Sequence, residues 1–211
     1  MVDPDAWSVR GSPTGIVMLG SMTKLLIIPG STREAAFSKR LAGAAAAIAR
    51  AAGAEASCVD LRDFAMPLYD GDLESAHGLP EGAVLLRTVV QQHDALVVVS
   101  PEYNSSIPAV LKNALDWLSR PYAGDPGVSV FRDKVAGLMS SSPGALGGLR
   151  ALVHLRQILM NLGLLVVTEQ FALGHADQAF APDGSIADAK QAAAVQKVLQ
   201  SVLRVSARLL S

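Results

Sequence analysis

The chain has 211 residues and half of them are hydrophobic, which is enough for one globular domain with a sizeable core. Its 18 Lys and Arg residues nearly balance 19 Asp and Glu residues, so it lacks the basic field that a nucleic acid partner would need. The single cysteine excludes an internal disulfide framework and indicates a reducing, cytoplasmic location.

The first residues differ from the rest of the chain. Residues 1–22 carry Gly, Pro and Ser without a sustained hydrophobic period, so we expect a loose N-terminal extension followed by one domain over residues 23–211. No apolar stretch reaches the roughly 18 residues that a membrane span needs. We therefore expect no membrane span.

From Lys24 onward, short apolar runs alternate with longer amphipathic ones, which is typical of βαβ units. Strands are expected at residues 25–29, 55–59, 95–100, 135–140 and 164–170, and helices at 37–52, 82–92, 107–118, 147–162 and 187–210. Five strands and five helices in strict alternation predict an α/β fold, a flavodoxin-like doubly wound five-stranded parallel sheet with helices on both faces. Such a fold binds its ligand at the carboxyl edge of the sheet, where the strand order reverses.

The loop after the first strand, GSTR, opens the first long helix. Ser31 and Thr32 provide hydroxyl groups and Arg33 a cation, beside the free amides at a helix N-terminus, and this combination suits a phosphate. The alternative is an ordinary helix cap with a solvated arginine. After the first strand there is neither the GK[ST] motif of a nucleoside triphosphatase nor the G-x-G-x-x-G motif of a dinucleotide-binding site.

The loop after the third strand begins the segment PEYNSSIPAVLKNALDW. Pro101 and Pro108 restrict the backbone on both sides, while Tyr103 offers a flat surface and Asn104 an amide that donates and accepts hydrogen bonds. This loop predicts a rigid ledge for a planar heterocycle. The alternative is an ordinary turn in which Asn104 bonds its own backbone.

The loop after the fourth strand, SSSPGALGG at residues 140–148, is small and polar. Its glycines permit backbone N–H groups to approach a ligand closely, although Gly and Ser clusters also form flexible connectors. All three loops follow strands, so we expect them at one edge of the sheet. Together they would supply a phosphate site, a flat ledge and donors to the edge of a ring.

The segments GSTR, PEYNSSIPAVLKNALDWLSRP and SSSPGALGGLRALVHLRQIL resemble the NAD(P)H-dependent FMN reductase family, close to the bacterial quinone and chromate reductases. The resemblance runs from about Lys24 to the last helix. It implies an enzyme that passes hydride from NADPH or NADH through FMN to a quinone, flavin, chromate or azo-type acceptor by a ping-pong mechanism. It also implies a homodimer or a homotetramer, with a small-molecule acceptor as the partner.

The resemblance also implies the residues of the FMN site. We expect Ser31, Thr32, Arg33 and Ser38 near the phosphate, Pro101, Glu102, Tyr103 and Asn104 along the isoalloxazine, and Ser141, Ser142, Gly144, Gly147 and Gly148 beside the ring. The family commonly has serine where this chain has Ala36. Since a neutral hydrogen bond contributes only about 0.5 to 1.5 kcal/mol, FMN binding should be weaker but survive.

No catalytic side chain or metal ligand set is predicted. The four histidines, His77, His93, His154 and His175, have neither zinc-ligand spacing nor companion cysteines. Two other functions stay open from the residues alone, a flavodoxin-type electron carrier and a non-enzymatic flavin-binding domain. Steady consumption of NADPH in the presence of a quinone would exclude an electron carrier. A purified protein that takes up no FMN would favour a non-enzymatic domain.

Overall fold

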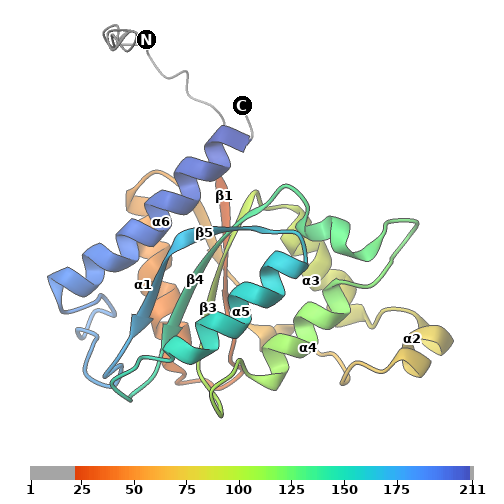
Figure 1. The fold of residues 1–211 in the computed structure, drawn as a ribbon, viewed down its shortest axis with the longest axis horizontal. Helices are drawn as coiled ribbons and strands as arrows, with labels where there is room; N and C mark the ends of the chain where they lie inside the picture. The colour runs from red at the N-terminus through yellow and green to blue at the C-terminus, as the bar shows by residue number, and fades with distance from the viewer. Residues whose placement is uncertain (1–21, 210–211) are drawn as a thin grey trace, which may run out of the picture.

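The computed structural model describes residues 22–209, so nearly all of the predicted N-terminal extension lies outside the described residues. The strands are β1 (Lys24–Pro29), β2 (Glu55–Cys58), β3 (Ala95–Ser100), β4 (Val135–Ser141) and β5 (Leu165–Leu173). They form one parallel sheet in the order β2-β1-β3-β4-β5 (Figure 1). This order confirms the predicted flavodoxin-like, doubly wound sheet.

Helices cover both faces of the sheet (Figure 1). On one face lie α1 (Phe37–Ala51) and α6 (Ala189–Leu209), and on the other α3 (Glu81–Gln91), α4 (Ala109–Leu118) and α5 (Leu149–Asn161). Alternate residues of β1 explain the two layers, because Leu25 and Ile27 pack with α1 and α6 while Leu26 packs with the other helices. Both faces of the strand are buried, as its continuous apolar run predicts.

The strict alternation of strands and helices was wrong between β2 and β3. This connection contains a short 3₁₀ helix (Leu61–Asp63) and the helix α2 (Gly71–His77) before α3 begins. No residue of α2 is buried, so the helix has no hydrophobic period that a sequence could reveal. Its local signal is Asp70, whose carboxylate accepts hydrogen bonds from the amides of Asp72 and Leu73.

Most other helix and strand boundaries differ from the predicted ones by one or two residues. The α4 helix starts after Pro108 rather than at residue 107, and α5 starts after Gly147 and Gly148, both of which have positive φ angles. Strand β5 extends beyond the predicted residue 170, with an irregular register opposite β4. Residue 210, the expected end of the last helix, lies outside the described residues.

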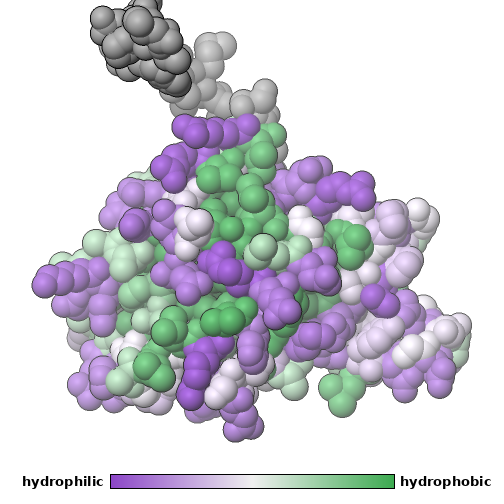
Figure 2. All heavy atoms as spheres, viewed as in Figure 1, coloured by the Kyte–Doolittle hydropathy of each residue, from purple (hydrophilic) through white to green (hydrophobic). Residues whose placement is uncertain are grey.

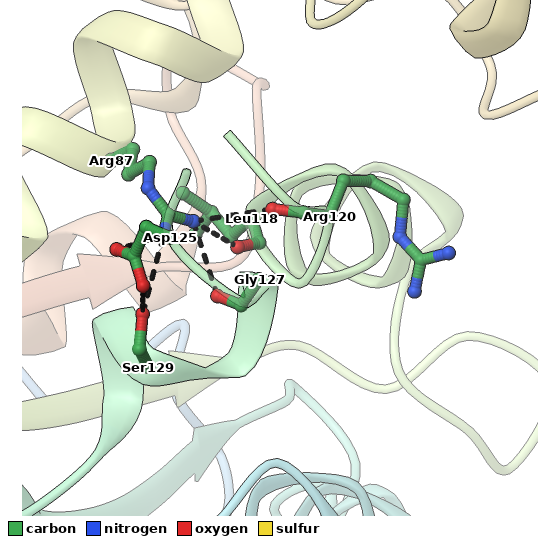
Figure 3. A network of polar contacts seen from close by, with 6 residues as sticks. All are labelled: Arg87, Leu118, Arg120, Asp125, Gly127 and Ser129. Atoms are coloured by element: carbon green, nitrogen blue, oxygen red, sulfur yellow. Dashed lines mark hydrogen bonds and ion pairs between the residues drawn. The ribbon is translucent and has the colours of Figure 1, made fainter. Parts of the chain in front are cut away.

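The long loop between α4 and β4 is held by a buried arginine of α3. Arg87 is only 2% exposed, and its guanidinium donates to the carbonyl oxygens of Leu118 (2.9 Å), Arg120 (3.4 Å) and Gly127 (3.1 Å) and pairs with Asp125 (2.7 Å). Figure 3 shows the guanidinium among these oxygens, with the Arg120 side chain pointing away. One side chain therefore satisfies several backbone groups of a loop that has little regular structure.

Candidate cofactor site

The three loops singled out in the sequence meet at the carboxyl edge of β1, β3 and β4. The strand order reverses between β1 and β3, which is where doubly wound sheets bind their ligands. A pocket at this edge is lined by Ser31, Arg33, Ala36, Phe37, Ser38, Pro101, Glu102, Tyr103, Ser141, Ser142 and Pro143. The pocket thus brings together most of the residues predicted to form the site.

The first side of the pocket is the start of α1. The N-cap residue is Ala36, no side chain caps the helix, and its first turn contains no acidic residue. The first amides of a helix have no intrahelical partners, and they carry partial positive charge. Arg33 is exposed and its side chain makes no hydrogen bond or ion pair with the described residues. This side of the pocket therefore suits an anion.

Two buried hydroxyl groups among the residues that line the pocket have no partners. Ser38 lies in the first turn of α1 and Ser141 at the end of β4, and they are 1% and 2% exposed. Neither hydroxyl oxygen has a hydrogen-bond partner among the described residues. A buried polar group without a partner costs about 1 to 3 kcal/mol, so both hydroxyls fit a polar ligand, and Ser38, in the first turn of α1, fits a phosphate group.

The second side of the pocket is a tight turn. The backbone groups of Tyr103 and Ser106 bond each other in both directions at 3.0 Å, and Asn104 and Ser105 between them have φ angles of 50° and 65°. A two-residue turn with left-handed backbone favours asparagine. Asn104 is exposed at the tip and does not line the pocket, whereas Tyr103, 44% exposed, does.

Glu102 lines the pocket, but its carboxylate is directed to the start of α5. The carboxylate accepts hydrogen bonds from the amides of Arg150 (3.0 Å) and Ala151 (3.2 Å) and pairs with the Arg150 guanidinium (2.5 Å). Burial raises the pKa of the Glu102 carboxyl, but these hydrogen bonds outweigh it and hold the pKa below its usual value. Glu102 is therefore ionised at neutral pH, and its charge is already paired.

The remaining predicted residues do not line the pocket, so their contacts with a cofactor stay predictions. Thr32 is half-buried within the first loop. Gly144 accepts a hydrogen bond from the Gly147 amide at 3.1 Å. Gly147 has a φ of 62°, and a Cβ there would lie 2.6 Å from the amide nitrogen of Gly174, so close packing on the end of β5 requires glycine. Gly148 is the N-cap of α5, with a φ of 85°.

Sequence reasoning missed Phe37. Phe37 lines the pocket as the first residue of α1, and its position in an apolar helix gave no separate signal. Arg120 does not line this pocket; it lines a groove between α4 and α5. Its guanidinium lies 5.2 Å from the centre of the Tyr69 ring and donates to the Tyr69 hydroxyl at 3.2 Å.

The described part of the chain has no metal centre of the usual kind. Within residues 22–209 no three His, Cys, Asp or Glu side chains are grouped so that they could hold a metal ion. Over the same residues, no helix combines the length and apolar character needed to cross a lipid bilayer. The pocket between β1, β3 and β4 thus remains the strongest candidate site.

Comparisons with known proteins bear on this pocket. The sequence model of one family, described as NADPH-dependent FMN reductase, matches residues 23–178. Quinone reductase of Escherichia coli K12 is 36% identical over 155 residues, covering 72% of this chain and 77% of that protein. 2-Hydroxy-1,4-benzoquinone reductase of a Burkholderia species is 35% identical over 164 residues, covering 77% of this chain and 85% of that protein.

A solved structure agrees with these relatives. The flavoenzyme NAD(P)H:(acceptor) oxidoreductase FerB from Paracoccus denitrificans superposes with a TM-score of 0.75 and 26% identity, covering 89% of this chain and 98% of that one. The family match includes all three loops of the pocket. The chain therefore belongs to the NADPH-dependent FMN reductase family, a family of oxidoreductases whose cofactors are FMN and NAD(P)H.

Proposed function

We propose that this protein binds FMN in the pocket between β1, β3 and β4 and passes hydride from NADPH or NADH to a quinone, flavin, chromate or azo-type acceptor. The observation that carries the proposal is the pair of buried, unpartnered hydroxyls of Ser38 and Ser141 beside the uncapped start of α1. The activities for which the relatives are named, quinone and 2-hydroxy-1,4-benzoquinone reduction, support a small-molecule acceptor. We propose no nucleic acid partner, because the chain's positive and negative charges nearly balance.

The phosphate of FMN would lie at the start of α1. The free amides there, the Ser38 hydroxyl and the Arg33 guanidinium would donate to its oxygens. Ser31 is 2% exposed and its hydroxyl accepts a hydrogen bond from the Arg33 amide at 3.2 Å, which holds the loop in shape. Ala36 adds no donor, so this chain would depend more on Arg33 than a relative with serine there.

The ring of FMN would lie along Pro101, Glu102 and Tyr103, with Ser141 and Ser142 at its edge. The rigid turn after Tyr103 would hold this ledge in place and exclude water from the covered side of the ring. When bound, FMN supplies the redox chemistry, taking a hydride from NAD(P)H and giving it to the acceptor. The protein's residues bind and orient the reactants on the open side, where donor and acceptor would bind in turn.

This proposal is tested with the purified protein. The visible spectrum and the mass of the released chromophore should identify FMN, and NADPH should be consumed steadily when a benzoquinone is present. Initial rates at several quinone concentrations should give parallel double-reciprocal lines, because donor and acceptor use the same space. A colourless protein that takes up no FMN would refute the proposal, and intersecting lines would refute the alternation alone.

Neighbouring serines of β4 provide a sharper prediction. Replacing Ser141 by alanine should leave the free protein as stable as the parent or slightly more stable, because it removes an unsatisfied hydroxyl, while weakening FMN binding by about 2- to 10-fold. The control is Ser140→Ala, since the Ser140 hydroxyl donates to the Gly147 carbonyl at 2.8 Å. It should lower the free energy of unfolding by about 1 kcal/mol.

Urea unfolding of the two cofactor-free variants, together with FMN titration, measures both effects. If Ser141→Ala destabilised the free protein as much as Ser140→Ala does, the Ser141 hydroxyl would have a structural partner. If FMN affinity did not change, the assignment of Ser141 to the ligand would be wrong.

We further propose a homodimer or homotetramer in the cytoplasm. Three large hydrophobic side chains of α5 are exposed. Leu149, Val153 and Met160 are 44%, 63% and 58% exposed. Figure 2 shows hydrophobic residues over α5 on this face of the molecule. An exposed apolar stripe of this kind is typical of an interface between subunits, and light scattering would measure the mass of the assembly.

A further inference from the structure

Two contacts attach the Tyr103–Ser106 turn to α5. On one side of the turn, the Glu102 carboxylate binds the first amides of α5 and the Arg150 guanidinium. On the other side, the Ser106 hydroxyl lies 2.9 Å from Nδ1 of His154. Arg150 and His154 are four residues apart in one helix and therefore share a face. Both ends of the turn are thus attached to the same stripe of α5.

Helix α5 has no cap of its own. Its N-cap is Gly148, which has no side chain, and the first turn contains no acidic residue. The Glu102 carboxylate takes the place of a local cap, and it is only 7% exposed. A Cβ at Gly148 would lie 3.4 Å from the Cβ of Glu102 and 3.1 Å from that of Ser140, so glycine leaves room for this approach. A negative charge is favoured at this end of a helix.

Two helix N-termini therefore lie near the pocket, and they are in different states. The start of α5 is occupied by the carboxylate of Glu102, whereas the start of α1 has neither a side-chain cap nor an acidic residue in its first turn. The partial positive charge at the start of α5 is therefore already matched by Glu102, whereas that at the start of α1 is available to an anionic ligand. Of the two helix N-termini, only the start of α1 is left without a side-chain partner.

We propose that Glu102 is a positioning residue that caps α5 and thereby fixes the width of the flavin pocket. The ledge formed by Pro101, Glu102 and Tyr103 is one side of this pocket. Another side is formed by the end of β4 and the loop that leads from it into α5, with Ser141, Ser142 and Pro143. The Glu102 cap joins these two sides. The inference rests on the proposed function, because it assumes that the pocket holds FMN.

The test compares Glu102→Gln and Glu102→Ala with the parent protein. Glutamine keeps one oxygen that can accept an amide hydrogen bond, and alanine keeps none. In the cofactor-free proteins, hydrogen exchange of the Arg150 and Ala151 amides should be faster in the order parent, Gln, Ala. The FMN dissociation constant should rise in the same order, by about 10-fold for alanine. The absorption bands of bound FMN should also shift, because the ring is held differently.

The matched control is Arg150→Ala. This change removes the ion pair but leaves both amide hydrogen bonds to Glu102, and the Arg150 side chain is 59% exposed, so FMN affinity should change by less than about 3-fold. The positioning role would be overturned if the Glu102 variants behaved like this control, or if exchange became faster while FMN affinity and absorption bands stayed unchanged. A parent protein that takes up no FMN would instead overturn the proposed function, and this inference with it.

Discussion

Replacing Arg33 by alanine should weaken FMN binding by about 10- to 100-fold. A hydrogen bond to a charged group contributes about 1.5 to 3 kcal/mol, and each 1.4 kcal/mol is a factor of ten in the dissociation constant. The Arg33 side chain has no partner among the described residues, so its loss should not disturb the fold. Quenching of FMN fluorescence on titration with cofactor-free protein measures the dissociation constant.

Arg132→Ala is a matched control for this experiment. Arg132 is also exposed and its loss changes the net charge equally, but it lies just before β4, at the opposite edge of the sheet. Its replacement should change FMN binding by less than about 2-fold, since exposed charges at such distances are screened. If Arg33→Ala bound FMN as tightly as Arg132→Ala does, the phosphate would not lie at the start of α1.

Replacing Arg87 by methionine should lower the free energy of unfolding by about 3 to 5 kcal/mol. The methionine would fill similar space, but the buried carbonyl oxygens of Leu118 and Gly127 would lose their donor (Figure 3). Arg87→Lys should lose less, because the ammonium keeps the charge and can reach some of the same oxygens. Thermal and urea unfolding followed by circular dichroism measures the loss.

The control for Arg87 is an ion pair at the surface. Lys112 pairs with Asp116 at 2.6 Å on α4, with side chains 47% and 36% exposed. Lys112→Met should cost less than about 1 kcal/mol, because water solvates the remaining Asp116 carboxylate. A loss in Arg87→Met no larger than the loss in Lys112→Met would show that the loop between α4 and β4 does not depend on Arg87.

The sheet and the grouping of the loops could be predicted because both follow from local pattern. Residues 95–100 form a continuous apolar run, and β3 has the predicted bounds. Parallel strands place their carboxyl ends at one edge, so three polar loops after strands had to lie close together. The unburied helix α2 could not be predicted in this way, because it has no apolar face.

The directions of individual side chains could not be predicted. The Glu102 carboxylate bonds the amides of Arg150 and Ala151, which are far away in sequence, while its contact with the cofactor stays a prediction. Asn104 has a left-handed backbone and lies at the tip of a turn, a position that its residue type alone did not reveal, and its contact with the cofactor stays a prediction. Residue type and position after a strand thus indicate the site, but long-range hydrogen bonds decide which side chains face a ligand.

The exposed helix α2 offers a place to attach the protein to a surface. It contributes no residue to the core, and in Figure 1 it lies at the far right of the molecule, away from the sheet. A cysteine introduced at the exposed Ala76 would allow single-point coupling to an electrode once Cys58, also exposed, is replaced. Such coupling would attach every molecule through the same exposed helix, which lines none of the pocket between β1, β3 and β4.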